Sequence, residues 1–430
     1  MREPLIAAPP SAQAETSARP RARVAYIMSR FPKITETFVL YEIVAVQAQG
    51  VPVEVYPLQR ERTAAMHPEA VPLVERAHFL PMIAPRFVRS HAYYLRRKPR
   101  AYLGALWDSL RATWGSARYF GGILAFFPKI VEFARMMERD GITHIHAHFA
   151  SHPAAAAFII HRLTGIPYSF TAHGSDLHRD QHMLREKIAE SAFAATISEY
   201  NVRVIMQTCG EDIANRVTVL RCGVDTSVFA PRPRAGANGG HGQPLMILNI
   251  GTLHEVKGQT YLIEACRLLK ERGLRFTCHF VGDGPDQAAL EAQVATAGLG
   301  EQVVFHGRRE RQAVVELLQQ ADILVAPSVP SSDNRREGIP VVLMEAMGSG
   351  VAVVASDLSG IPELVIDSKS GLLTPPGNAE AIADAVERLA RDPALRQRLV
   401  DGGREKVLRE FDLATNAAAL VERFASGVAK

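Results

Sequence analysis

Short apolar runs alternate with longer amphipathic stretches along most of the chain. In the first half, strands are predicted at 24–28, 51–56, 143–148, 168–172, 194–197 and 217–220. In the second half, strands are predicted at 245–250, 277–281, 303–305, 323–326 and 352–355. The stretches between the runs, such as 37–49, have the length and spacing of helices. Strands separated by helices predict parallel sheets covered on both faces, and hence an α/β fold.

The alternation is interrupted at 231–244, where Pro-Arg-Pro is followed by closely spaced glycines. Such a stretch between two patterned regions predicts a linker. We therefore expect an N-terminal domain at 22–230 and a C-terminal domain at 245–410. Residues 411–430 predict a last helix that can cross back to the first domain. Residues 1–21, rich in Pro, Ala and Ser, predict a disordered tail.

A basic and aromatic segment at 86–139 predicts a helical insert in the first domain. It holds 11 Lys/Arg and 3 Asp/Glu, a local net charge of +8, and both tryptophans, Trp107 and Trp114. One interpretation is contact with an anionic membrane surface, with the cations on headgroups and the aromatic rings in the interface. The other is a helical insert that packs its apolar face on the first domain.

The composition is that of an ordinary globular enzyme and excludes only a few classes of protein. The 430 residues suffice for two domains, and 47% hydrophobic with 22% charged residues is ordinary for a globular enzyme. A net charge of +4 is too small to indicate nucleic-acid binding. The 4 cysteines lack metal-ligand spacing, and no run of 18 apolar residues predicts a transmembrane helix. We expect a cytoplasmic protein, at most peripheral on the inner face of the plasma membrane.

The strongest chemical motif is the segment EGIPVVLME at 337–345. Pro340 suits a helix start, so Glu337 is predicted in the loop before the helix and Glu345 inside it. The N-terminus of a helix favours negative or polar ligands because its first peptide N–H groups lack partners. These groups belong to Gly338, Ile339 and Val341.

This segment, with AMGSGVAVVA at 346–355 and GIPE at 360–363, resembles the E-x7-E motif of the large family-4 retaining glycosyltransferases. The resemblance extends from Val24 to about Phe411. Further motifs that carry it are GTLHEVKG at 251–258, VGDGP at 281–285, HG at 306–307, GLL at 371–373, FP at 31–32, ETF at 36–38, HAHF at 146–149, HGSD at 173–176, ISE at 197–199 and GVD at 223–225. The opening FP and ETF loop is most similar to members that build exopolysaccharide, colanic-acid-like or capsular chains.

The resemblance implies the GT-B fold, in which two Rossmann-like domains with parallel sheets face a central cleft. It implies retaining transfer of a sugar from a nucleotide-sugar, UDP- or GDP-linked, to a glycan or lipid-linked acceptor. Neither a metal nor another cofactor is expected, because the resemblance is to members that generally need none. The oxygens of the departing diphosphate can take the proton of the acceptor hydroxyl.

The resemblance also assigns roles to individual residues. Glu345 would accept hydrogen bonds from the ribose hydroxyls, and Glu337 would bind hydroxyls of the donor sugar. Lys257 would face the diphosphate, which Gly251 lets the backbone approach closely. His173 would face the sugar and the reaction centre from the first domain.

Two features depart from the family pattern: Thr252, and the loop at 31–36, where many members have a Gly-Gly turn after the first strand. Thr252 stands where the family usually has arginine, so one phosphate contact is missing; Arg308, Arg309 or Lys33 could replace it. On the acceptor side, next to Lys33, Glu36 is interpreted either as an acid or base for the acceptor or as a carboxylate at a helix start.

Three histidines, His144, His146 and His148, alternate along one predicted strand and so share a face. We do not expect a metal site there, on the argument that no carboxylate neighbours them. Strand packing is predicted instead, with His148 near the acceptor edge of the cleft.

Three other functions are alternatives to glycosyl transfer. A nicotinamide oxidoreductase is excluded, because the loop at 29–36 after the first strand contains no glycine. A nucleotide-sugar epimerase stays open. So does a nucleotide-sugar-binding scaffold without transfer activity, which Thr252 favours and the intact Glu337, Glu345, Lys257 and His173 oppose.

Overall fold

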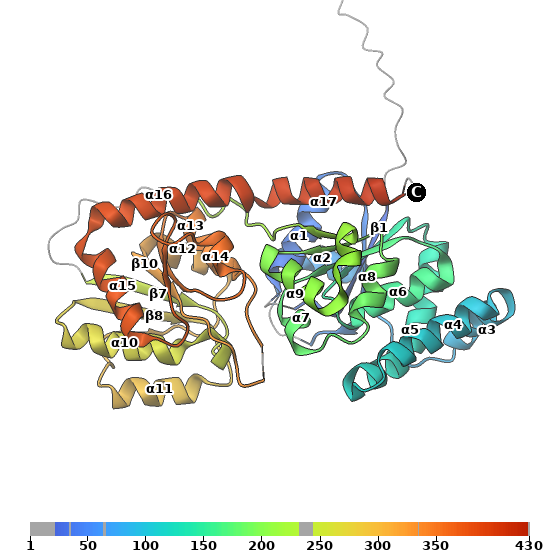
Figure 1. Cartoon of the computed structure of the whole chain (residues 1–430), viewed down its shortest axis with the longest axis horizontal. Helices are drawn as coiled ribbons and strands as arrows, with labels where there is room; N and C mark the ends of the chain where they lie inside the picture. The colour runs from blue at the N-terminus through green and yellow to red at the C-terminus, as the bar shows by residue number, and fades with distance from the viewer. Residues whose placement is uncertain (1–21, 34–35, 63–65, 232–243, 334, 429–430) are drawn as a thin grey trace, which may run out of the picture.

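The protein has two α/β domains that lie side by side, with the last two helices running along both of them (Figure 1). The computed structural model describes residues 22–33, 36–62, 66–231, 244–333 and 335–428. The predicted tail at 1–21 and most of the predicted linker lie outside the described residues.

The N-terminal domain is built on a six-stranded parallel sheet of order β2-β1-β3-β4-β5-β6. All residues of β3, β4 and β5 are buried, as expected for strands of a sheet covered on both faces. The strands are β1 (Val24–Phe31), β2 (Val53–Arg60), β3 (His144–His148), β4 (Tyr168–Ala172), β5 (Phe193–Thr196) and β6 (Val217–Val219).

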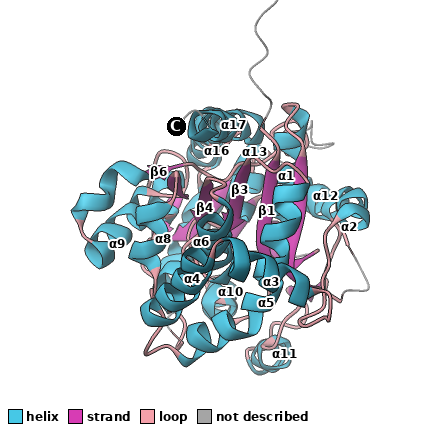
Figure 2. Ribbon diagram, turned by 90° about the vertical axis from the view of Figure 1, so that its right-hand side faces the viewer, coloured by secondary structure: helices cyan, strands magenta, loops and turns pink. Residues whose placement is uncertain are grey.

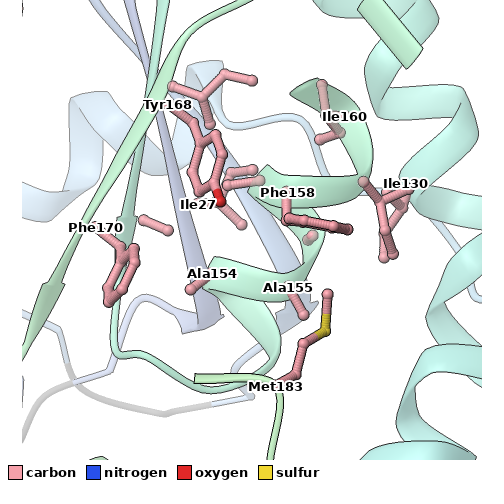
Figure 3. Packing of buried hydrophobic residues seen from close by; sticks show 14 of the residues in the cluster. Ile27, Ile130, Ala154, Ala155, Phe158, Ile160, Tyr168, Phe170 and Met183 are labelled. Atoms are coloured by element: carbon pink, nitrogen blue, oxygen red, sulfur yellow. The ribbon is translucent and has the colours of Figure 1, made fainter. Parts of the chain in front are cut away.

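Helices cover the two faces of this sheet, with α17 on one side and α6 on the other (Figure 2). Alternate residues of β1 therefore enter different cores: Ile27 packs on the α6 side, and Tyr26 packs on the side of α1 and α17. Figure 3 shows the α6 side, where Ile27, Phe158 and Tyr168 meet. The helices are α1 (Thr37–Ala48), η1 (Pro68–Ala70), α2 (Val71–Arg76), α3 (Phe87–Arg97), α4 (Pro99–Ala112), α5 (Ala117–Arg139), α6 (His152–Thr164), α7 (Ser175–Arg179), α8 (Leu184–Glu190), α9 (Glu199–Cys209) and η2 (Glu211–Arg216).

The C-terminal domain repeats this architecture with a sheet of order β12-β11-β10-β7-β8-β9, again parallel throughout. Its strands are β7 (Leu245–Ile250), β8 (Phe276–Val281), β9 (Val303–Phe305), β10 (Ile323–Ala326), β11 (Ala352–Ser356) and β12 (Leu372–Thr374). Its helices are η3 (Glu255–Lys257), α10 (Gln259–Glu271), α11 (Gln287–Thr296), α12 (Arg311–Gln320), α13 (Val341–Gly348), α14 (Ile361–Leu364), α15 (Ala379–Arg391) and α16 (Pro393–Glu410).

All of the predicted strands are present, some with bounds shifted by a few residues. The loop expected from Ser29 begins later, because Arg30 and Phe31 continue the pairing of β1 with β2. The three-residue strand β12 was not predicted, because so short a run shows no period of its own.

The predicted insert is three helices, α3, α4 and α5. α4 and α5 both pack against α6, so the interpretation in which the insert packs on the first domain is correct. The same insert also leaves Trp107 and Trp114 exposed.

The domains contact each other at several places, two of which involve helices. The last helix, α17 (Leu413–Val428), packs on α1 and β3 of the N-terminal domain, and buries Phe424 among aromatic rings of Tyr26, His144 and Phe193. From the C-terminal domain, the Glu363 carboxylate accepts hydrogen bonds from the first backbone N–H groups of α9, at 2.9 and 2.8 Å. A carboxylate at this end of a helix is stabilising.

We expect Phe424→Ala to lower the free energy of unfolding of the N-terminal domain by about 3–5 kcal/mol, because it leaves a cavity in a packed aromatic cluster. Thermal unfolding followed by circular dichroism measures the loss. Leu408→Ala, at an exposed position of α16, is the matched control and leaves the transition unchanged. Equal, small effects of both substitutions would contradict a stabilising role for α17.

Candidate functional site

A cavity of about 500 Å³ lies between the two domains. Its walls come from the loops that follow parallel strands, including His173 after β4 and Gly251 after β7. Open α/β sheets place their binding crevice at this end of the strands. The cavity is therefore the candidate functional site.

Almost every residue singled out from the sequence lines this cavity, whatever its position in the chain. Those that line it are Lys33, Glu36, His173, Gly251, Thr252, Lys257, Arg308, Arg309, Glu337, Gly338, Ile339, Val341 and Glu345. His148 does not; it is fully buried behind His173, so its expected place at the cleft edge is wrong.

The two residues expected on opposite parts of the donor, Glu337 and Lys257, form an ion pair with each other. The second carboxylate oxygen of Glu337 accepts a hydrogen bond of 2.5 Å from the buried hydroxyl of Ser328. The carboxylate is thus held from two sides and its orientation is fixed. Ser328 was missed by the sequence reasoning because it lies outside the motif, between β10 and Glu337.

Glu345 lies inside α13, on the cavity side of the helix, as predicted. The helix begins at Val341, with Pro340 as the residue just before it. Burial raises the pKa of Glu345 to about 7, and the nearby Arg311 opposes the shift only in part. A carboxyl group with this pKa ionises readily near neutral pH once a donor of hydrogen bonds or a positive charge approaches.

The charge of the cavity wall is positive. Seven Lys/Arg side chains and four Asp/Glu side chains line it, a difference of 7 − 4 = +3. The cations are Lys33, Lys257, Arg308, Arg309, Arg311, Arg335 and Arg336, and the acids are Glu36, Asp283, Glu337 and Glu345. Such a wall favours an anion. Sequence reasoning missed Arg311, Arg335 and Arg336, because none of them belongs to a motif.

Two of the candidate replacements for the arginine missing at Thr252 already have acidic partners. Arg308 donates to Asp283 at 2.9 Å, and Lys33 donates to Glu36 at 2.6 Å. Glu36 is the residue immediately before α1, and its side chain does not cap that helix. Both interpretations of Glu36 therefore stay open.

Glycines allow the two domains to approach at the cavity floor. A Cβ atom on Gly338 would overlap the backbone carbonyl oxygen of His173, and one on Gly174 would lie 3.2 Å from the Cα of Gly338. Gly174 also has a φ of 126°, which other residues rarely adopt. The backbone contact thus requires glycine on both sides.

His173 is buried against the rings of Phe38 and Phe149, whose centroids lie 4.6 and 4.8 Å from its own. Its Nε2 lies 3.0 Å from Nδ1 of His148, and its Nδ1 lies 3.8 Å from the Sγ of Cys222. Burial lowers the pKa of His173 to about 3. The imidazole is therefore neutral at physiological pH.

The argument that no carboxylate neighbours the three histidines of β3 is wrong. The Oε1 atom of Glu42, on α1, lies 3.0 Å from His148 Nε2 and 3.8 Å from His146 Nε2. Ligand atoms of these three residues lie within 4.8 Å of one another, close enough to surround a metal ion. The contact joins residues about 100 positions apart, so sequence spacing could not reveal it.

Hydrogen bonds already use both ring nitrogens of His146 and His148. His146 bonds to the hydroxyls of Ser169 and Thr171, at 2.8 and 3.1 Å, and His148 bonds to Glu42 and His173. We interpret the group as a hydrogen-bond network, and our prediction of no metal site stays a prediction.

We expect Glu345→Gln to stabilise the unliganded protein at pH 8 but not at pH 5. The folded pKa of about 7 exceeds the ordinary value of 4.5, so the carboxyl group costs stability as the pH rises from 4.5 through 7. At pH 8 the substitution should raise the Tm by about 2 °C or more, measured by differential scanning fluorimetry. The exposed Glu291→Gln is the control. The same Tm shift at both pH values would refute the assignment.

Comparisons with known proteins point to glycosyltransferases. Residues 236–406 match the family described as glycosyl transferases group 1. The amylovoran biosynthesis glycosyltransferase AmsK of Erwinia amylovora is 36% identical over 248 residues, which cover 56% of this chain and 59% of that protein. The putative colanic acid biosynthesis glycosyltransferase WcaL of Salmonella typhimurium is 28% identical over 405 residues, 91% of this chain and 96% of that protein.

The chain spans only about half the length of two of its relatives, 59% of AmsK and 48% of the WcaL of Escherichia coli. Among solved structures, Alr3699/HepE of Anabaena in complex with UDP superposes with a TM-score of 0.71 at 18% identity, covering 94% of this chain and 100% of that one. At this identity the likeness shows the fold, and it confirms the GT-B fold expected from the sequence.

Proposed function

We propose, from the premise that residues 236–406 belong to the glycosyl transferases group 1 family, that the chain is a glycosyltransferase of cell-surface polysaccharide synthesis. It would move a sugar from a nucleotide-sugar to a glycan or lipid-linked acceptor. The observation that carries the proposal is the cavity that sets Glu337, Glu345 and Lys257 opposite His173. The names of relatives, which refer to amylovoran and colanic acid, support polysaccharide synthesis.

The donor would lie along the C-terminal wall of the cavity. Glu345, an acceptor of hydrogen bonds when ionised, suits the two ribose hydroxyls. The cationic wall suits the diphosphate, and Glu337 suits sugar hydroxyls near His173. UDP in the fold neighbour HepE supports a uridine nucleotide, and GDP is the alternative.

The reaction would proceed with retention and without a metal. Cleavage of the donor leaves negative charge on the diphosphate, and fixed positive side chains stabilise that charge. The wall has a surplus of three positive charges, which suits this role. The acceptor hydroxyl would attack from the same face as the departing diphosphate, whose oxygen takes its proton, so the enzyme supplies mainly orientation and charge.

We expect Glu337→Gln and His173→Ala each to lower turnover at least tenfold, because each removes a polar contact to the donor sugar. Transfer is measured by mass spectrometry of products from a panel of UDP- and GDP-sugars, with lipid extract as acceptor. Glu291→Gln, on the exposed face of α11, is the control and keeps full activity.

The same assay separates transfer from its two alternatives. Nucleotide release that needs an acceptor supports transfer, and isomerised donor without an acceptor would identify an epimerase. Donor binding without either product would identify a scaffold. Near-normal turnover of both site variants would refute the site.

The helical insert supports a further part of the proposal, which is docking of the enzyme to an anionic membrane. Several of its large apolar side chains are 50% to 76% exposed, on a segment of net charge +8. These are Val88, Leu103, Trp107, Trp114 and Leu124, with Ile83 just before the insert. None of the described helices is long and apolar enough to span a bilayer. We propose a cytoplasmic enzyme bound peripherally to the inner face of the plasma membrane, where lipid-linked acceptors lie.

We expect vesicles with anionic lipid to sediment the protein at low salt, and both high salt and neutral lipid to abolish sedimentation. The double variant Trp107→Ser with Trp114→Ser should reduce binding at least threefold, because it removes the interfacial rings. Val304→Ser, at an exposed apolar position of the C-terminal domain, is the control. Equal binding to neutral vesicles, or none to anionic ones, would remove this part of the proposal.

A further inference from the structure

A line of three side chains runs from the interior of the N-terminal domain to the cavity. Glu42 on α1 contacts His148 on β3 at 3.0 Å, and His148 contacts His173 at 3.0 Å. His148 is fully buried, and His173 is the member that lines the cavity. The three residues come from three separate segments, and the line ends at the reaction centre proposed above.

The direction of the hydrogen bonds follows from the carboxylate. Burial alone would raise the pKa of Glu42, but His148, His146 and the hydroxyl of Tyr26 lower it to about 2. Glu42 is thus ionised and can only accept, so Nε2 of His148 carries a proton. In the neutral form of His148, whose one proton is then on Nε2, Nδ1 is the acceptor.

The bond to His148 also determines which ring nitrogen of His173 carries the proton. Because Nδ1 of His148 accepts, Nε2 of His173 donates. A neutral imidazole carries one proton, so Nδ1 of His173 keeps a lone pair. This atom lies 3.8 Å from the thiol sulfur of Cys222, and both residues line the cavity.

We propose that Glu42 and His148 are positioning residues that hold His173 as its Nε2–H tautomer and so present Nδ1 as a hydrogen-bond acceptor at the cavity wall. The partner is a hydroxyl group of the donor sugar or of the acceptor. The proposal rests on the glycosyl transfer proposed for this cavity.

The neighbouring histidines provide a contrast within the same strand. His144 and His146 share the hydroxyl of Ser169, at 2.7 and 2.8 Å. A hydroxyl can donate or accept, so it does not impose one tautomer on its partner. The line that starts at the Glu42 carboxylate has a partner that only accepts, and that line leads to the cavity.

The fixed tautomer also limits what His173 does. Its pKa of about 3 makes it too weak a base to hold a proton at neutral pH. It therefore orients a hydroxyl rather than removing its proton, in agreement with a mechanism in which the departing diphosphate takes the proton.

The tautomer can be measured without any substrate. Nitrogen NMR of the full chain labelled with ¹⁵N-histidine distinguishes protonated from unprotonated ring nitrogens, and a His173→Gln variant assigns the signals. At pH 8 we expect His173 to be protonated at Nε2 and unprotonated at Nδ1. A proton on Nδ1 of His173 would overturn the proposal, whether or not the protein transfers sugar.

Substitutions of His148 test the consequence for the reaction. A glutamine at this position can donate to Glu42 and accept from His173, whereas leucine can do neither. We expect His148→Leu to lower kcat about tenfold and leave the KM for the donor within about threefold, and His148→Gln to restore most of the loss. Ser169→Ala, which removes hydrogen bonds of the same kind from the same strands, is the control and keeps its kcat.

A second variant separates positioning from folding. Glu42→Gln keeps the size of the side chain but no longer imposes the direction of the hydrogen bonds, so we expect a mixture of His173 tautomers and a lower kcat at unchanged Tm. Full activity of both His148→Leu and Glu42→Gln would overturn the proposal. Absence of transfer by the wild-type protein with every donor would instead overturn the proposed function, and the NMR result would still decide the tautomer.

Discussion

The site depends on the close approach of two backbone segments, one from each domain. A Cβ on Gly338 would overlap the carbonyl oxygen of His173, and Gly174, 3.2 Å from the Cα of Gly338 by the same measure, has a φ of 126°. This contact brings the loop before α13 against the end of β4. A larger residue at Gly338 would push the two halves of the cavity apart, and one at Gly174 would strain the backbone. The other interdomain contacts, through Glu363 and α17, hold this arrangement from the outside.

The two glutamates of the motif are stabilised in different ways. Glu337 is held by Lys257 and Ser328, so its charge is compensated before any ligand enters. Glu345 is not compensated to the same extent, and burial raises its pKa to about 7. A ligand that donates hydrogen bonds to Glu345 would relieve this cost. Ligand binding would then gain free energy at Glu345, whereas the orientation and charge of Glu337 are already fixed by Lys257 and Ser328.

The fold could be predicted well because strands and helices each have a characteristic spacing of apolar residues along the chain. Strands such as β7, β9 and β10 appear with the predicted bounds, since each is an apolar run between clear helices. The boundary of β1 was wrong, because Arg30 and Phe31 are held by pairing with β2 and not by their own polarity.

The candidate site was predictable only as far as its residues belong to motifs. The pairing of Glu337 with Lys257 joins positions 80 apart, and that of Glu42 with His148 joins positions 106 apart. Both arise from the order of strands and helices in space, which a single sequence does not give. The Glu42 carboxylate beside the histidines was missed for this reason. Arg311, Arg335 and Arg336 were missed as well, because they lie outside the motifs.

The arginines that line the cavity reduce the importance of having threonine rather than arginine at position 252. Thr252 lies exposed at the cavity, where a guanidinium would add one more positive charge to the wall. The wall already gathers Arg308 and Arg309 from the loop after β9, and Arg335 and Arg336 from the loop before α13. Charge stabilisation of a diphosphate depends on the summed field of nearby groups more than on one contact. Thr252 therefore removes one phosphate contact that the resemblance implies, but the summed positive charge of the wall still suits the proposed transfer, which weakens the argument for an inactive scaffold.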